Sequence, residues 1–296
     1  MRSGFVSLVG RPNVGKSTLI NALVGYKIAI TSDKAQTTRN MIQGIYNDED
    51  SQIVFVDTPG IHKPKHKLGQ RLNEEAYYSI DDVDIILFLI DVTMPFGKGD
   101  NFILDKIKEA NKPTFLVLNK VDKIKRDDLF NLILNYKGLY DFKEIVPVSA
   151  LKEKNVNELI KTLKKYLPDN VKYFPDEELT NTTIEFRVAE LIREKVLRLT
   201  NEEVPHSVTC VVENYIEKKD KAIINATIIV ERDSLKRIII GKQGAMLKEI
   251  GSKARIDIEN MIGKKVYLEI FVKTIKNWRD KEKYLKELGF YDIEED

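Results

Sequence analysis

The chain has 296 residues, which is enough for about two domains that each bury a hydrophobic core. Hydrophobic residues make up 43% and the formal net charge is +2, so the composition excludes a disordered chain and gives no global argument for nucleic-acid binding. The longest apolar run, residues 85–90, is too short to span a membrane, and a single cysteine, Cys210, excludes an intrachain disulfide and indicates a reducing cytosol. We expect Cys210 to fill a core, and we expect no signal peptide because a strand-like run begins at residue 5.

The first pattern with chemical meaning is residues 10–17, which read G-R-P-N-V-G-K-S. They lie between the apolar run 5–9 and a stretch of helical spacing at 18–24, which is the strand–loop–helix context of a phosphate-binding loop. We expect Gly10 and Gly15 to turn backbone N–H groups onto phosphate oxygens, Lys16 to supply a cation, and Ser17 to bind Mg²⁺. The other triphosphate-binding residues expected here are Arg11, Pro12, Asn13, Val14 and Thr18.

Residues 31–39 read as a polar loop, and the strand-like runs 41–46 and 53–56 predict an antiparallel hairpin. The second run ends in Asp57-Thr58-Pro59-Gly60, where a carboxylate on the Mg²⁺ side belongs in nucleotide-hydrolysing enzymes of this kind. Gly60 can bring a backbone N–H to the γ-phosphate. The basic segment 61–67 that follows has two interpretations, a nucleotide-dependent switch or a solvated loop.

A strand is predicted at 85–91, a helix at about 100–110 and a strand at 114–118, which ends in Asn119-Lys120-Val121-Asp122. The Asp122 carboxylate can accept two hydrogen bonds from guanine, whereas adenine has no donor there and is rejected. Asn119 holds the other ring edge or ties neighbouring loops together. The motif therefore favours GTP and opposes the alternative of an ATPase or kinase.

The last strand of this half, 144–148, leads into Ser149-Ala150-Leu151, and the Ala150 N–H is expected to donate to guanine O6. Asn155 and Glu158 predict a capping box that opens a helix over 156–167. Because strands and helices alternate, the fold class expected for residues 1–167 is an α/β doubly wound mixed sheet.

These motifs, in this order, resemble the translation-factor-related class of GTPases. Pro12-Asn13 in the loop and the Thr-Thr pair at 37–38 are similar to the small bacterial ribosome-assembly GTPases. The resemblance implies that Thr38 joins Ser17 and Asp57 as a metal ligand when GTP is bound.

Hydrolysis of GTP requires positioning and charge neutralisation more than covalent chemistry. The residues expected to act in catalysis are Asn13, Lys16, Thr38 and Gly60. The glutamine that orients water in Ras-like enzymes is replaced by Ile61, so slow intrinsic hydrolysis is expected. By resemblance, Asn13 implies a bound K⁺ that acts as an arginine finger, and we hold this as a hypothesis.

Residues 168–181 contain two prolines and no periodicity, and we interpret them as a linker. Residues 182–296 then predict a helix that starts at Thr182 with Glu185 three positions later, a hairpin from 208–216 and 222–230, and a short helix at 235–240. A loop at 241–244, a helix to about 262, a strand at 266–272 and a last helix at 276–288 complete the α+β pattern.

The loop from Gly241 to Gly244 reads G-x-x-G between two helices, a setting that resembles the type II KH module, which clamps single-stranded nucleic acid. Six basic side chains against only Glu249 between residues 236 and 255 support this interpretation. No aromatic residue occurs between 234 and 265, so we expect no stacking platform there. The residues expected to contact RNA are Lys236, Arg237, Ile239, Ile240, Gly241, Lys242, Gln243, Gly244, Lys248, Lys253 and Arg255.

A GTPase domain followed by a type II KH domain resembles the Era family of bacterial GTPases over essentially the whole chain. The resemblance implies a GTPase with Mg²⁺ that binds GTP and GDP, binds single-stranded RNA near the 3′ end of 16S ribosomal RNA, and acts in maturation of the small ribosomal subunit. It further implies a cytoplasmic monomer with peripheral contact at the inner membrane. The alternative is an RNA-binding assembly factor in which GTP is a structural or switch ligand and hydrolysis is incidental.

Overall fold

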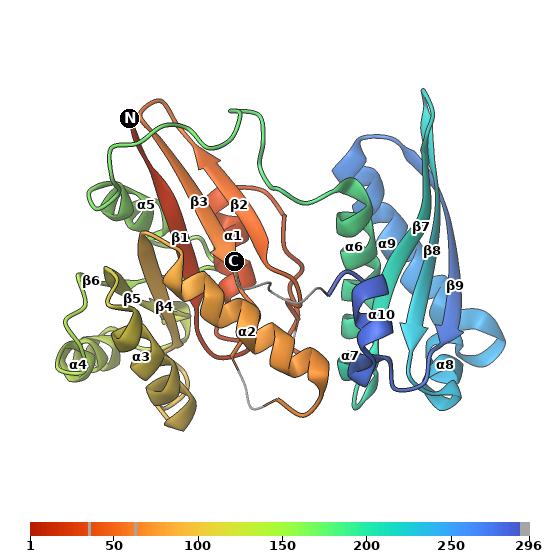
Figure 1. Cartoon of the computed structure of the whole chain (residues 1–296), viewed down its shortest axis with the longest axis horizontal. Helices are drawn as coiled ribbons and strands as arrows, with labels where there is room; N and C mark the ends of the chain where they lie inside the picture. The colour runs from red at the N-terminus through yellow and green to blue at the C-terminus, as the bar shows by residue number, and fades with distance from the viewer. Residues whose placement is uncertain (35–36, 62–63, 291–296) are drawn as a thin grey trace.

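The computed structural model describes residues 1–34, 37–61 and 64–290. It contains a six-stranded sheet and a three-stranded sheet, each with its own helices, and the two lie side by side (Figure 1). We call the elements from β1 to α5 the first unit and those from α6 to α10 the second unit. Of the basic segment 61–67, His62 and Lys63 lie outside the described residues.

The sheet of the first unit has the strand order β2-β3-β1-β4-β5-β6, and all neighbours are parallel except β2 and β3. This arrangement confirms the expected hairpin and the doubly wound mixed sheet. The strands are β1 (Arg2–Val9), β2 (Ile42–Asn47), β3 (Ser51–Asp57), β4 (Ile85–Asp91), β5 (Thr114–Asn119) and β6 (Glu144–Pro147). The helices are α1 (Lys16–Val24), α2 (Lys67–Asp81), α3 (Lys98–Ala110), α4 (Arg126–Lys137) and α5 (Val156–Lys164), with a 3-10 turn η1 (Val121–Lys123).

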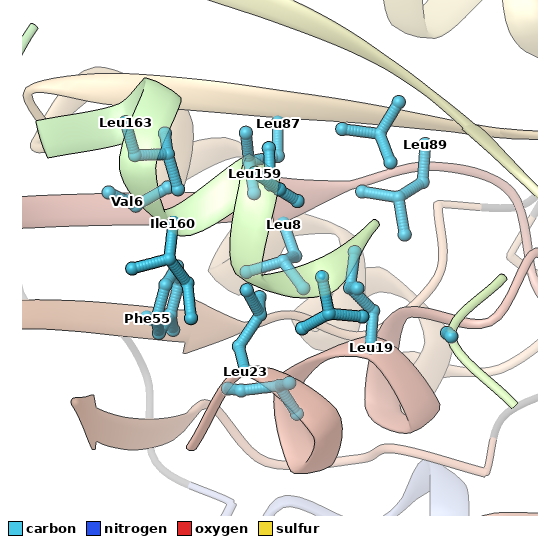
Figure 2. Close-up of a cluster of buried hydrophobic side chains, with 14 of the residues drawn as sticks. Val6, Leu8, Leu19, Leu23, Phe55, Leu87, Leu89, Leu159, Ile160 and Leu163 are labelled. Carbon is cyan, nitrogen blue, oxygen red and sulfur yellow. The ribbon is translucent and has the colours of Figure 1, made fainter. Parts of the chain in front are cut away.

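Helices cover both faces of this sheet, which explains why β4 is apolar at nearly every position. Leu19 and Leu23 of α1 and Leu159 of α5 pack on one face against Val6 and strand neighbours (Figure 2). The core on the other face includes side chains of β4, α2, α3 and α4. Parallel strands direct the carboxyl ends of β1, β3 and β5 to the same edge, where Gly10, Asp57 and Asn119 lie.

The second unit has a sheet of β7 (Thr209–Glu217), β8 (Lys221–Val230) and β9 (Lys265–Thr274), in that order. β7 and β8 form the expected antiparallel hairpin, and β9 lies parallel to β8. The helices are α6 (Ile184–Leu199), α7 (Val204–Ser207), α8 (Asp233–Ile240), α9 (Ala245–Ile262) and α10 (Glu282–Glu287), with 3-10 turns η2 (Lys242–Gly244) and η3 (Trp278–Asp280). Cys210 packs in the core of this unit, and burial raises the pKa of its thiol, as expected of a core residue.

Three local predictions were wrong. Asn155 has a left-handed backbone (φ 61°) and makes no side-chain cap; its amide instead donates to the Pro147 carbonyl at 2.8 Å, so there is no capping box, and α5 ends at Lys164. The cap of α6 is Thr183, one residue later than expected, because its hydroxyl accepts the Phe186 N–H at 3.2 Å. The last helix is broken into η3 and α10.

The segment 168–181 follows the edge of the first sheet and is held there by hydrogen bonds. The Ile45 N–H donates to the Leu179 carbonyl at 2.9 Å, and the Gln52 amide donates to the Phe174 carbonyl at 2.8 Å. The segment is therefore fixed along most of its length before α6 begins. Among the described residues, no helix combines the length and the apolar character needed to cross a membrane.

Candidate functional site

The phosphate-binding loop has a tightly turned backbone. It joins β1 to α1, and Asn13 (φ 66°) and Gly15 (φ 103°) adopt left-handed conformations. A Cβ at Gly15 would collide with the Asn119 amide, and a Cβ at Gly10 would lie 2.7 Å from the Leu89 carbonyl oxygen. Both positions therefore require glycine, and the loop wraps closely around the N-terminus of α1.

Lys16 is buried beneath this loop. Its ammonium donates to the carbonyls of Gly10 at 3.1 Å and Arg11 at 3.3 Å. Burial lowers its pKa to about 8, and attraction to Asp57 offsets part of that effect. An anion that binds beside this poorly solvated ammonium group strongly stabilises its charged form.

Three oxygen-bearing side chains converge beside Lys16. The Ser17 and Thr38 hydroxyls are 2.7 Å apart, and Thr38 donates to one Asp57 carboxylate oxygen at 3.2 Å. The other oxygen, Oδ1, is buried and has no hydrogen-bond partner among the residues that the structure describes, and burial raises the pKa of the carboxyl group. Hydroxyl and carboxylate oxygens with an unused buried acceptor fit a hard divalent cation such as Mg²⁺.

The loop opens onto a pocket of about 370 Å³. Its walls are the phosphate-binding loop, residues 31–33 and 37–38, Gly60 and Lys120. A Cβ at Gly60 would lie 2.9 Å from Pro12 Cα, so a side chain there would push the two loops apart. Thr58 is not at the wall; its buried hydroxyl donates to the Leu8 carbonyl at 2.9 Å and fixes the loop that carries Gly60.

The carboxyl ends of β5 and β6 form the other end of this site. Asn119 ties two loops together, because its amide nitrogen donates to the Val14 carbonyl at 2.8 Å and its oxygen accepts the Ala150 N–H at 3.0 Å. The Ala150 N–H, which we expected to meet a base, is therefore used within the protein here. Ser149 donates to Asp122 at 2.6 Å, and this hydrogen bond lowers the pKa of the exposed Asp122 carboxyl.

Other predicted residues have structural contacts. The Lys120 ammonium donates to the Asn13 carbonyl at 2.8 Å and pairs with Asp91. Arg11 forms an ion pair with Asp100 at 3.1 Å. Ile61 is buried in the core that lies between the sheet and α2, so the side chain at this position is turned away from the pocket wall.

The loop that carries Thr38 also contacts the second unit. Next to Thr38, the buried Arg39 guanidinium donates to the carbonyls of Val208 at 2.6 Å, Pro205 at 3.1 Å and His206 at 3.0 Å. Arg39 also faces the Trp278 ring, 5.9 Å from its centroid. No periodicity or motif in the sequence marks these contacts, because they join segments that are about 170 to 240 residues apart.

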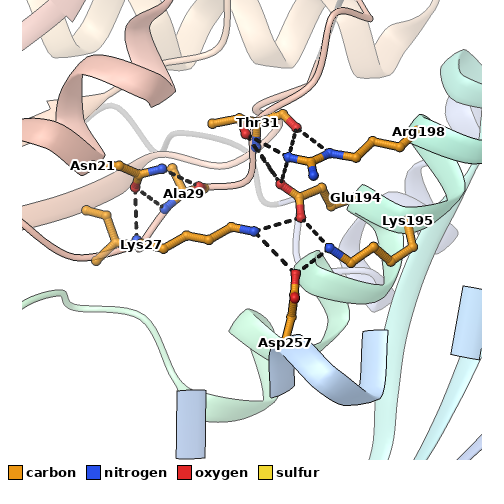
Figure 3. A network of polar contacts seen from close by, with 9 residues as sticks. Asn21, Lys27, Ala29, Thr31, Glu194, Lys195, Arg198 and Asp257 are labelled. Atoms are coloured by element: carbon orange, nitrogen blue, oxygen red, sulfur yellow. Dashed lines mark hydrogen bonds and ion pairs between the residues drawn. The ribbon is translucent and has the colours of Figure 1, made fainter. Parts of the chain in front are cut away.

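A second set of contacts centres on Glu194 of α6 (Figure 3). Its fully buried carboxylate accepts hydrogen bonds from Lys27 at 2.7 Å, the Thr31 N–H at 3.0 Å and Lys195 at 3.0 Å, and from Arg198 at 2.9 Å. Lys27 and Thr31 belong to the first unit. The carboxylate therefore joins α6 to the stretch that forms one wall of the nucleotide pocket.

A third contact joins α2 to the C-terminal segment. Leu68 and Leu72 pack with Trp278, Leu285 and Phe290. Two segments of the nucleotide-binding unit therefore contact the second unit. One is the loop before β2, which carries Thr38, and the other is α2, which follows Gly60.

The glycine loop of the second unit joins α8 to α9. Gly241 (φ 73°), Gln243 (φ 52°) and Gly244 (φ 79°) have positive φ, and a Cβ at Gly241 would lie 2.9 Å from the Met246 nitrogen. Ile239 is fully buried in the core, so its side chain supports this loop from inside rather than facing a ligand as expected. Lys242, Lys248, Lys253 and Arg255 are exposed, and Lys253 pairs with Glu249 at 2.7 Å.

A groove of about 440 Å³ begins at this loop and runs between α9 and β9. Lys248 and Arg255 lie on its helical wall, and Tyr267 and Ile270 lie on its strand wall. The strand wall is not predicted from the sequence, because the stretch without aromatic residues, 234–265, ends two residues before Tyr267.

Comparison with known proteins matches each of the two units to a known family. Residues 5–120 match the family described as 50S ribosome-binding GTPase, and residues 203–279 match the KH domain family. Two solved structures of Era are similar to this chain, each with 43% identity, a TM-score of 0.95, and 98% of this chain and 99% of the other covered. One is Aquifex aeolicus Era, a single-residue variant bound to GDP and AlF4⁻; the other is Era in complex with MgGDPNP and nucleotides 1506–1542 of 16S ribosomal RNA.

Proposed function

This chain belongs to the Era family of GTPases, and on that premise we propose that its GTP cycle controls binding of single-stranded RNA near the 3′ end of 16S ribosomal RNA during assembly of the small ribosomal subunit. One observation carries the link between the two activities. Thr38, which contacts Ser17 and Asp57 in the nucleotide site, is followed directly by Arg39, which donates three hydrogen bonds to the second unit.

Recognition of guanine is assigned to Asp122, with Asn119 and Ser149 holding the loops around it. The exposed carboxylate with a lowered pKa stays ionised and can accept both guanine donors. The Ala150 N–H can serve guanine O6 only if its bond to Asn119 is shared or exchanged. Val121 and Leu151 are assigned to the base site because they stand next to Asp122 and Ala150 in the sequence. Pro12 and Thr18 belong to the phosphate-binding loop and the start of α1, and we assign them to the phosphate site.

Ser17, Thr38 and Asp57 are the residues that would hold Mg²⁺, which when bound neutralises charge on the phosphate oxygens. Lys16 adds a buried cation to the same anion, and Gly60 lies at the pocket wall where we place the γ-phosphate. These groups position and stabilise charge without covalent chemistry. The carboxamide of Asn13 is proposed as the K⁺ ligand; it now donates to the Asp33 carbonyl at 2.8 Å, on the pocket wall.

RNA binding is assigned to the second unit, with the phosphates against Gly241–Gly244 and the bases in the groove between α9 and β9. The exposed cations of α8, the glycine loop and α9 support this assignment by charge. We propose residues 1–167 as the GTPase domain, 168–181 as the linker and 182–296 as the KH domain. A cytoplasmic monomer with peripheral contact at the inner membrane is proposed from family membership alone.

The substitution pair Gly241→Asp and Gly244→Asp tests the RNA assignment. Carboxylates at these two positions repel phosphate, and a side chain at Gly241 also clashes with Met246. We expect filter binding to nucleotides 1506–1542 of 16S ribosomal RNA to be lost while GTP affinity stays at the parent value. Retained RNA affinity in the folded double variant would refute the assignment.

A second function, a factor in which GTP is a switch ligand with incidental hydrolysis, is favoured by one observation. Ile61 stands where Ras-like enzymes have the glutamine that orients water. Its side chain is apolar and buried, so it cannot orient water for attack on the γ-phosphate. Single-turnover hydrolysis with and without RNA separates the two.

A further inference from the structure

Two large aromatic side chains on β9 remain exposed beside the groove. Tyr267 is 60% exposed and Phe271 is 54% exposed. We propose that these two rings form a stacking platform for bases of the single-stranded RNA where it passes beyond the groove. This inference rests on the proposed RNA-binding function and adds a site that lies outside the glycine-loop groove.

The alternation of β9 separates the two rings from the core. Val266, Leu268 and Ile270 pack in the core of the second unit, whereas Tyr267 and Phe271 point to the opposite face. β9 is also an edge strand, because its only neighbour in the described sheet is β8 (Figure 1). Four residues of strand separate the rings by roughly 13 Å, so each ring is available to a different base.

The platform is continuous with the groove. Tyr267 is one of the residues of the edge strand β9 that border the groove opposite Lys248 and Arg255, while its ring points to the other face of the sheet. An RNA strand held by those cations therefore reaches the Tyr267 ring where it crosses this edge of the sheet. The described side chains of β9 give no other aromatic residue, which makes Phe271 the next ring along that strand.

Charge along β9 favours a polyanion with unpaired bases over a purely apolar partner. Lys265 and Lys273 flank the two rings on the same face of the strand, and both are exposed, with Lys265 3.8 Å from the Glu259 carboxylate. The one acid between the rings, Glu269, accepts a hydrogen bond from the Asn225 amide at 2.6 Å and is thereby directed toward β8. Aromatic faces with nearby cations are the elements that bind single strands with little sequence preference.

The test measures binding of the full chain with GDPNP to RNA nucleotides 1506–1542 of 16S ribosomal RNA by fluorescence anisotropy. Tyr267→Ala and Phe271→Ala should each raise Kd by roughly 5- to 100-fold, whereas Tyr267→Phe and Phe271→Tyr should stay within about twofold of the parent. Phe130→Ala, at a ring of α4 that is 62% exposed, is the matched control and should leave Kd unchanged.

A second readout follows the stacking itself. Replacing single adenines of the RNA by 2-aminopurine should reveal positions whose fluorescence is quenched by the parent protein and recovers with the alanine variants. If the parent and both alanine variants bind the RNA equally well and quench 2-aminopurine equally, the stacking platform is refuted and the proposed function stands. Absence of RNA binding by the parent would overturn both. The glycine loop alone can clamp a short RNA of about four nucleotides. If the alanine variants lose as much affinity for this short RNA as for the long one, the rings do not extend the site beyond the groove.

Discussion

Substitution of Glu194 by glutamine should weaken the attachment of α6 to the nucleotide-binding unit. The carboxylate is fully buried and neutralises Lys195, whose side chain is only 8% exposed. Removing one partner of a buried ion pair typically costs about 3–5 kcal/mol. Because Lys195 also pairs with Asp257, and because Lys27 and Arg198 are 41% and 48% exposed, we expect the low end, about 3 kcal/mol of unfolding free energy.

The measurement is urea unfolding at pH 7 without nucleotide, followed by circular dichroism. Glu109→Gln is the matched control, since Glu109 forms only an exposed pair with Lys106 and its loss should cost under about 1 kcal/mol. If the unfolding free energy of Glu194→Gln lies within about 1 kcal/mol of that of the parent, the reasoning is refuted, because the buried ion pairs then contribute little stability beyond what solvation would give.

The same network predicts a pH dependence. Burial alone raises the pKa of Glu194, but hydrogen bonds from Lys27 and the Thr31 N–H outweigh it, and the pKa lies below its ordinary value. A carboxyl whose pKa is lowered in the folded state stabilises the protein above its unfolded pKa and loses that contribution as the pH falls through the folded value. The stability difference between parent and Glu194→Gln should therefore be full at pH 7 and shrink below about pH 4.

Three further outcomes are expected. Asp122→Asn should weaken GTP binding and admit xanthosine triphosphate, whose 2-oxo group suits an amide donor; retained preference for GTP would remove Asp122 from the base site. GTP turnover should be faster in K⁺ than in Na⁺ buffer, and Asn13→Ala should abolish the difference; equal kcat of the parent in both salts would exclude the K⁺ hypothesis. Thr183→Ala should lower the unfolding free energy by about 1 kcal/mol and Thr182→Ala by less, since only Thr183 caps α6; the reverse order would contradict the capping geometry.

The nucleotide site was predictable because its chemistry is local in the sequence. Gly15 and Lys16 follow a strand and open a helix, and Asp57 and Asn119 end strands whose parallel pairing brings them to one edge. Spacing and strand order were enough to bring them together. The unpartnered Asp57 oxygen and the contact between Ser17 and Thr38 needed coordinates, as did the use of Ala150 by Asn119.

The contacts between the units were not predictable in the same way. Glu194 lies on a helix whose periodicity marks its apolar face, and nothing in that pattern distinguishes a buried acid from a solvated one. Arg39 and Trp278 meet through tertiary packing alone. Likewise, α2 and α4 were not predicted, and Thr182 was preferred to Thr183 because both residues precede the same apolar pattern.

Hydrolysis of GTP in the presence of RNA tests the central claim most directly. Pre-bound GTP should be hydrolysed in a single turnover at least about tenfold faster with nucleotides 1506–1542 of 16S ribosomal RNA than without them, as expected of a GTPase whose catalytic groups are completed by a partner. The Gly241→Asp, Gly244→Asp double variant should keep the slow basal rate and lose the acceleration. A rate that RNA leaves unchanged in the parent protein would contradict the account and leave GTP as a switch ligand with incidental turnover.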